Sequence, residues 1–116
     1  MNLDEIKRIK IKNKISFKLI KRGGKWLEIR LARGFFGNVK VGTVIELYNG
    51  DESIQVIVES KHLCDSLEDL LSNRLIRIGS TPHIRNEEIG TYYRQFYSER
   101  ALKQNKLVVL KIKKRI

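Results

Sequence analysis

The chain has 116 residues, 41% of them hydrophobic, which is the size and composition of one globular domain. The single cysteine excludes a disulfide within the chain, and no apolar run approaches the ~20 residues of a membrane-spanning helix. The N-terminal residues lack the apolar core of a signal peptide. We therefore expect one domain, residues 1–116, in the cytoplasm, with no membrane association and monomeric by default.

The charge is strongly positive and unevenly placed. The chain carries a net charge of +11, of which residues 1–40 contribute +9, residues 41–100 contribute −4 and residues 101–116 contribute +6. Such a surface attracts polyanions, with nucleic acid as the first candidate and an anionic membrane surface as the second. The third explanation is that the protein is basic without binding a polyanion. If the two chain ends lie side by side, they form one basic face.

Hydrophobic periodicity predicts the elements in chain order. We expect a strand (6–13), a helix (13–24), a strand (22–34), a glycine-punctuated loop (32–42) and two hairpin strands (43–49 and 53–60). After these we expect a helix (65–73), a short apolar run that is an optional strand and then a loop (74–83), a helix (86–105) and a last strand (106–116). A basic amphipathic arm is the alternative for the first strand, but its alternation has period 2. Strands outnumber helices and the hairpin is antiparallel, so we predict an α+β fold with a curled sheet or small barrel.

Local signals support several of these boundaries. Gly23 and Gly24 are typical of a helix C-terminus. Ser66 and Asp69 have capping-box spacing, and Ser98 is placed to begin a second short helical turn within the late helix.

The third predicted segment has two unlike faces. Leu27, Ile29 and Leu31 form an apolar face, as a half-buried strand requires, whereas Glu28 and Arg30 alternate with them on the other face. Charged residues in this pattern usually form a solvated cluster of ion pairs, each pair contributing ~0–1 kcal/mol. The alternative is that this second face is the wall of a site.

The segment "GGKWLEIR" resembles the G-x-K-x-x-E-x-R motif of the ASCH domain, a relative of the PUA fold. Further segments resemble that family in the same order: "VKVGTVIELYN", "SLEDLLSN" and "YYRQFYSERALKQNKLVVLKI". The resemblance covers roughly residues 6–113. It implies a small, mixed, PUA-like β-barrel of five to six strands, flanked by two to three helices, with a cleft beside the motif. It also implies binding of nucleic acid, RNA rather than DNA.

The resemblance assigns roles to the charged face. Glu28 would hold Lys25 and Arg30, which would contact phosphates or a base edge. Trp26 would either stack on a base or cap the barrel. From charge and approximate position we add four cations at the rim, and from the late helix one tyrosine: Arg33, Lys40, Arg85, Arg94 and Tyr93. Because an aromatic stripe at helical spacing is usually core, we expect Tyr93 and Phe96 to be mostly buried.

Some members of the family are enzymes, so a small hydrolase is the alternative function. The substrate would be RNA, as for a ribonuclease, or a modified nucleoside, as for an amidohydrolase, with Lys25 and Glu28 as catalytic residues. Family members that deacylate acetylated cytidine have a Thr nucleophile at the position of Glu28, which disfavours that activity here. No cofactor is implied. His62, Cys64 and His83 do not complete a metal site, so none is predicted.

Overall fold

The computed structural model describes residues 6–115, apart from the side chains of residues 77 and 86. Within this range there are five strands: β1 (Lys7–Lys10), β2 (Leu27–Leu31), β3 (Val44–Asn49), β4 (Glu52–Cys64) and β5 (Leu107–Lys114). The helices are α1 (Lys14–Arg22), α2 (Gly34–Asn38), α3 (Leu67–Leu71), α4 (Arg74–Ser80), α5 (Ile89–Arg94) and α6 (Glu99–Gln104), with a 3₁₀ turn, η1 (Asn86–Glu88), before α5.

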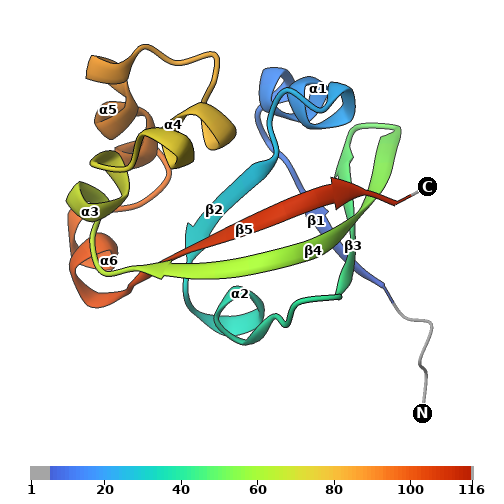
Figure 1. The fold of residues 1–116 in the computed structure, drawn as a ribbon, viewed down its shortest axis with the longest axis horizontal. Helices are drawn as coiled ribbons and strands as arrows, with labels where there is room; N and C mark the ends of the chain where they lie inside the picture. Colours follow the sequence, from blue (N-terminus) through green and yellow to red (C-terminus); the bar gives the residue numbers. More distant parts are fainter. Residues whose placement is uncertain (1–5, 116) are drawn as a thin grey trace.

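The strands form one curled sheet in the order β1-β3-β4-β5-β2. β1 pairs with β3 in parallel, and the other pairings are antiparallel. The sheet curls into an open half-barrel whose two edge strands are β1 and β2 (Figure 1). The predicted α+β class with a curled sheet is confirmed.

The long strand β4 bends within this sheet. Its first half pairs with β3, and it continues beside β5 as far as Cys64. The register with β5 shifts between Val58 and Ser60, which places an extra residue, Glu59, in β4. A bulge of this kind bends the strand and increases its twist, and so contributes to the curl of the sheet.

Strand β5 is buried on both faces over its first four residues, Leu107 to Leu110. Leu107 and Val109 belong to a core cluster shared with α3 to α6, which gather at one end of the sheet (Figure 1). Val108 and Leu110 belong to a second cluster inside the curl, shared with α1. β5 therefore separates two cores, one between the sheet and the helices and one within the half-barrel.

Helix α1 has the C-terminus that its glycines predict. Gly23 adopts φ +82°, a left-handed conformation that glycine accepts without strain, and its N–H donates to Ile20 O. At the other end, the Asn13 side chain accepts a hydrogen bond from Ser16 N. The helix therefore ends abruptly, and the chain enters β2 within a few residues.

Three expectations for the helices need correction. Residues 74–80 form a helix rather than a strand, and the predicted loop 32–42 contains α2. The helix expected over 86–105 is broken into η1, α5 and α6, with Ser98 as the N-cap of α6. The described residues therefore contain six short α-helices instead of two or three. Helices α2, α4, α5 and α6 are too short for periodicity to identify their bounds, and they are stabilised mainly by packing.

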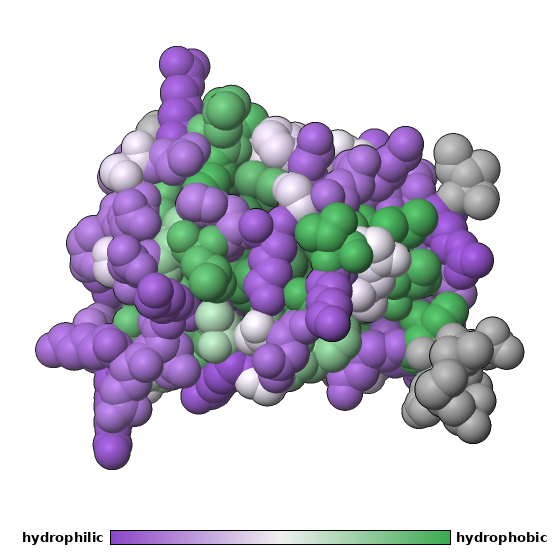
Figure 2. All heavy atoms as spheres, turned by 60° about the horizontal axis from the view of Figure 1, so that its bottom comes forward, coloured by the Kyte–Doolittle hydropathy of each residue, from purple (hydrophilic) through white to green (hydrophobic). Residues whose placement is uncertain are grey.

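No helix among the described residues is long and apolar enough to span a membrane. Figure 2 brings the lower side of the Figure 1 view forward and shows hydrophilic side chains projecting around this face, with hydrophobic residues between them. Hydrophilic side chains are therefore spread over this face rather than gathered in one patch.

Candidate functional site

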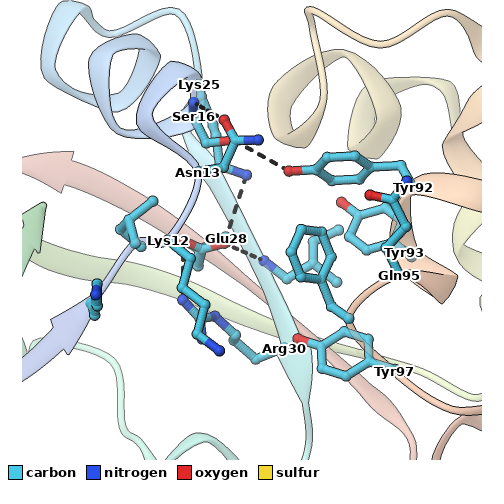
Figure 3. A pocket seen from close by; sticks show the side chains of 14 residues that line it. Lys12, Asn13, Ser16, Lys25, Glu28, Arg30, Tyr92, Tyr93, Gln95 and Tyr97 are labelled. Atoms are coloured by element: carbon cyan, nitrogen blue, oxygen red, sulfur yellow. Dashed lines mark hydrogen bonds and ion pairs between the residues drawn. The ribbon is translucent and has the colours of Figure 1, made fainter.

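A cavity of about 280 Å³ opens between the two edges of the half-barrel (Figure 3). Its walls come from the end of β1, the start of α1, strand β2 and the segment that begins in α5. The lining residues are Lys10, Ile11, Lys12, Asn13, Ser16, Lys25, Glu28, Ile29, Arg30, Tyr92, Tyr93, Gln95, Phe96 and Tyr97.

Lys25 lies in the wall of this cavity and is 6% exposed. Its Nζ donates a hydrogen bond of 2.7 Å to Ser80 O and lies 3.6 Å from Glu28 Oε1. Burial lowers the pKa of Lys25, and the nearby Glu28 carboxylate opposes that effect. The ammonium is thus held by a fixed carbonyl and a carboxylate, which leaves it less free for a phosphate than a surface lysine.

Glu28 lies between two cations. Its side chain is 12% exposed, with Oε1 facing Lys25 and Oε2 4.0 Å from Arg30 Nη2. Oε1 also accepts a hydrogen bond of 3.2 Å from Ile29 N. Among the residues that the structure describes, Oε2 has no hydrogen-bond partner. The oxygens of a buried carboxylate normally accept hydrogen bonds. Glu28 therefore retains one acceptor oxygen, Oε2, that is not used.

Local structure explains why Lys25 and Glu28 meet. The N–H groups of Gly24 and Lys25 both donate to Leu19 O at the end of α1, which turns the chain sharply into β2. Trp26 N then donates to Gly79 O in α4, and Trp26 O accepts from Ile112 N in β5. This double attachment brings the end of α4, with the Ser80 carbonyl, against Lys25.

Four aromatic side chains form the opposite wall. Tyr92 makes edge-to-face contacts with Tyr93 and Phe96, with ring centroids 5.3 and 5.1 Å apart, and Tyr97 lies nearer Arg30 (Figure 3). Tyr93 is buried and donates to Ser80 Oγ at 3.3 Å. Burial raises the pKa of both Tyr93 and Tyr97, so these phenols stay neutral in neutral solution.

One polar contact spans the two walls. Ser16 Oγ in α1 lies 3.3 Å from the Tyr92 hydroxyl in α5 (Figure 3). It joins the walls at the end of the cavity where Lys25 lies. At the other end Lys12 and Arg30 project near Tyr97, so the cavity has a polar, largely neutralised inner end and a cationic outer end.

Four of the predicted site residues line this cavity: Lys25, Glu28, Arg30 and Tyr93. Five do not: Trp26, Arg33, Lys40, Arg85 and Arg94. The Trp26 ring packs beside Gly79 on the core cluster between the sheet and the helices.

The other four lie at exposed positions away from the lining. Arg33 precedes α2, and Lys40 follows it. Arg85 forms ion pairs with Glu87 and Glu88, whereas Arg94 pairs with Glu99 at 2.8 Å and Glu68 at 3.8 Å. These ion pairs partly neutralise the cations expected at the rim.

Sequence reasoning missed most of the remaining lining residues. Lys10 ends β1 and Lys12 follows it, and their alternation indicates exposure but not a cavity. Asn13 was predicted only as a helix boundary. Phe96 was expected to be mostly buried, and this is wrong because it is 45% exposed at the cavity. The break after α5 turns Phe96 out of the buried stripe of a continuous helix.

Within residues 6–115, no three His, Cys, Asp or Glu side chains are grouped closely enough to hold a metal ion together. Fold and cavity together define a small α+β protein whose curled sheet carries a cationic, aromatic-lined cavity.

Two solved structures share this fold. The crystal structure of hypothetical protein PH0355 has a TM-score of 0.82 and 25% sequence identity, covering 96% of this chain and 100% of that one. The solution NMR structure of protein PF0455 from Pyrococcus furiosus has a TM-score of 0.74 and 24% identity, covering 95% and 97%. No family model and no curated protein matches the chain. The similarity therefore concerns the fold alone.

Proposed function

We propose that this chain is a nucleic-acid-binding protein of the ASCH type, within the PUA-like superfamily, and that it binds single-stranded RNA in the cavity between β1 and β2. The observation that carries the proposal is the composition of one cavity: Lys12 and Arg30 at its outer end and Tyr92 and Phe96 on its wall. Proteins that bind single strands combine cations for the phosphates with aromatic rings on which bases stack.

The size of the cavity suits a single strand better than a duplex. A volume of about 280 Å³ lies near the lower limit of small-ligand pockets, typically ~300–1,000 Å³. One nucleotide unit fits such a space, whereas a base-paired helix would lie across its mouth. The exposed ring of Phe96 is accessible for stacking at this mouth.

Titration of a short, labelled single-stranded RNA at several salt concentrations tests this function. We expect micromolar or tighter binding at low salt, weakening steeply as salt rises, because phosphate neutralisation releases counterions. Arg30→Ala should weaken binding more than Lys113→Ala, which removes an exposed cation of β5 outside the cavity. Absence of binding at low salt would refute the proposal, and equal effects of the two variants would place the RNA elsewhere.

Hydrolysis of RNA or of a modified nucleoside is a second candidate, favoured by the buried Lys25 3.6 Å from Glu28. A lysine whose pKa is lowered by burial is suited to proton transfer. Incubation with RNA and with acetylated nucleosides, comparing the wild type with Glu28→Gln, tests this activity. Turnover that survives Glu28→Gln unchanged would exclude Glu28 as its acid or base.

A further inference from the structure

The inner end of the cavity contains one acceptor that its neighbours leave unused. Glu28 Oε1 takes the Ile29 N–H, whereas the contacts to Lys25 and Arg30 are ion pairs of 3.6 and 4.0 Å. Oε2 lacks a hydrogen-bond partner among the described residues. Oε2 is itself buried, so it reaches a ligand through a rotation about the terminal torsion of Glu28, which is soft and leaves the backbone in place.

The surroundings of Glu28 select the part of a nucleotide that can reach it. A phosphate would meet the carboxylate as a like charge, so it is received on the side facing the outer end, by Lys12 and by Arg30, whose Nη2 lies 4.0 Å from Glu28 Oε2 (Figure 3). The aromatic wall of Tyr92 and Tyr93 lies across from the inner end. A nucleotide therefore enters with its base towards Glu28 and its phosphate towards Lys12 and Arg30.

We propose that Glu28 determines base specificity, by accepting hydrogen bonds from an unpaired base that carries an amino group, with guanine preferred. The inference rests on the proposed function and adds the class of nucleotide that the cavity takes. Guanine presents an imino N–H and an amino group side by side, which Oε2 and the remaining lone pair of Oε1 can accept while Oε1 keeps the Ile29 N–H. In uracil the single imino N–H lies between two carbonyl oxygens, which repel a carboxylate.

Binding of three nucleotides tests this assignment: the 5′-monophosphates of guanosine, inosine and uridine, titrated into the full chain and followed by NMR or calorimetry. Inosine differs from guanosine only by the missing 2-amino group, so stacking and phosphate contacts are matched. We expect guanosine monophosphate to bind about tenfold tighter than inosine monophosphate, as for loss of one hydrogen bond to a charged group. Uridine monophosphate should bind more weakly still.

Glu28→Gln should abolish the preference for guanosine over inosine and leave the salt dependence of RNA binding in place. Glu46→Gln is the matched control, because Glu46 also lies on a strand and pairs with an arginine, Arg8, but does not line the cavity. It should keep the preference. Thermal unfolding of both variants shows whether the exchange at Glu28 disturbs the fold.

Equal affinities for guanosine and inosine monophosphate in the wild type would overturn the inference, whatever affinities the two variants have. If RNA then still binds with steep salt dependence, the proposed function stands and only the role of Glu28 fails. If neither nucleotides nor RNA bind, the proposed function fails together with the inference.

Discussion

His83 lies behind the aromatic wall of the cavity, in the segment between α4 and α5. Its ring contacts Tyr92 edge-on, with centroids 5.9 Å apart, and neither ring nitrogen has a hydrogen-bond partner among the described residues. Burial lowers the pKa of His83 from its ordinary value of 6.5, and the nearby Lys25 ammonium lowers it further. The folded protein therefore resists the protonation of this side chain.

Stability should consequently depend on His83 in mildly acidic solution. Below pH 6.5 the unfolded chain binds a proton at His83 that the folded chain does not. The free energy of unfolding therefore falls as the pH drops from 6.5 towards the lower pKa of the folded state. We expect His83→Phe to flatten this dependence in chemical denaturation between about pH 7 and about pH 5.

The exposed His62 provides the control for this experiment. His62→Gln is a substitution at an exposed position, and the free energy of unfolding should therefore change by no more than ~0.5 kcal/mol. A variant His83→Phe with the wild-type slope would show that His83 is protonated equally in both states.

At the scale of elements, the contact between α4 and the start of β2 orders the cavity wall. Gly79 accepts the Trp26 N–H, and a Cβ at this position would lie 2.7 Å from Leu27 Cδ1 and 3.0 Å from Trp26 Cε2. The glycine thus allows the helix to approach the strand closely enough for Ser80 O to reach Lys25.

Gly79→Ala should therefore destabilise the protein although alanine favours helix. Crowding of a packed core costs ~1–3 kcal/mol and the gain in helix propensity is up to ~1 kcal/mol, so we expect a net loss of about 1–2 kcal/mol. Denaturant titration measures this loss.

Gly24→Ala is the matched control for the glycine test. A Cβ there would lie 3.4 Å from Leu19 Cδ2, an ordinary contact. If the two alanine variants unfold at the same denaturant concentration, the close approach of α4 to β2 is not what stabilises this wall.

For the whole molecule, sheet order decides where the positive charge lies. The basic segments at the two ends of the chain meet through β2, which lies within residues 1–40 and pairs with β5, whereas β3 and β4 separate β1 from β5. The condition for one basic face, that the two chain ends lie side by side, is therefore met by β2 and β5 but not by β1 and β5. The curl instead brings the end of β1, with Lys10 and Lys12, to the cavity beside β2.

This arrangement predicts unequal effects for two double variants that remove the same charge. Lys10→Ala with Lys12→Ala should reduce the salt slope of single-stranded RNA binding by about 1.4, at ~0.7 for each lost phosphate contact. Lys111→Ala with Lys113→Ala removes exposed cations of β5 that do not line the cavity, and should change the slope little. Equal reductions would indicate binding over a diffuse basic surface.

The sequence by itself determined the features that depend on near neighbours in the chain. The alternation of Leu27, Ile29 and Leu31 predicted β2, and Gly23 predicted the end of α1, since side-chain period and left-handed backbone are local properties. Ser66 also caps α3 as its spacing to Asp69 indicated. The motif residues Lys25, Glu28 and Arg30 were placed together for the same reason, because they lie close to one another in one short segment.

Only the tertiary structure decided what faces that segment. The cavity has walls from residues 10–16, 25–30 and 92–97, and no periodicity relates segments so distant in the chain. The helical state of residues 74–80, the break after α5 and the exposure of Phe96 likewise depend on packing between elements. The charged face of β2 can be predicted from neighbouring residues in the sequence. The aromatic wall opposite it exists only because the curled sheet brings β1, β2 and α5 together.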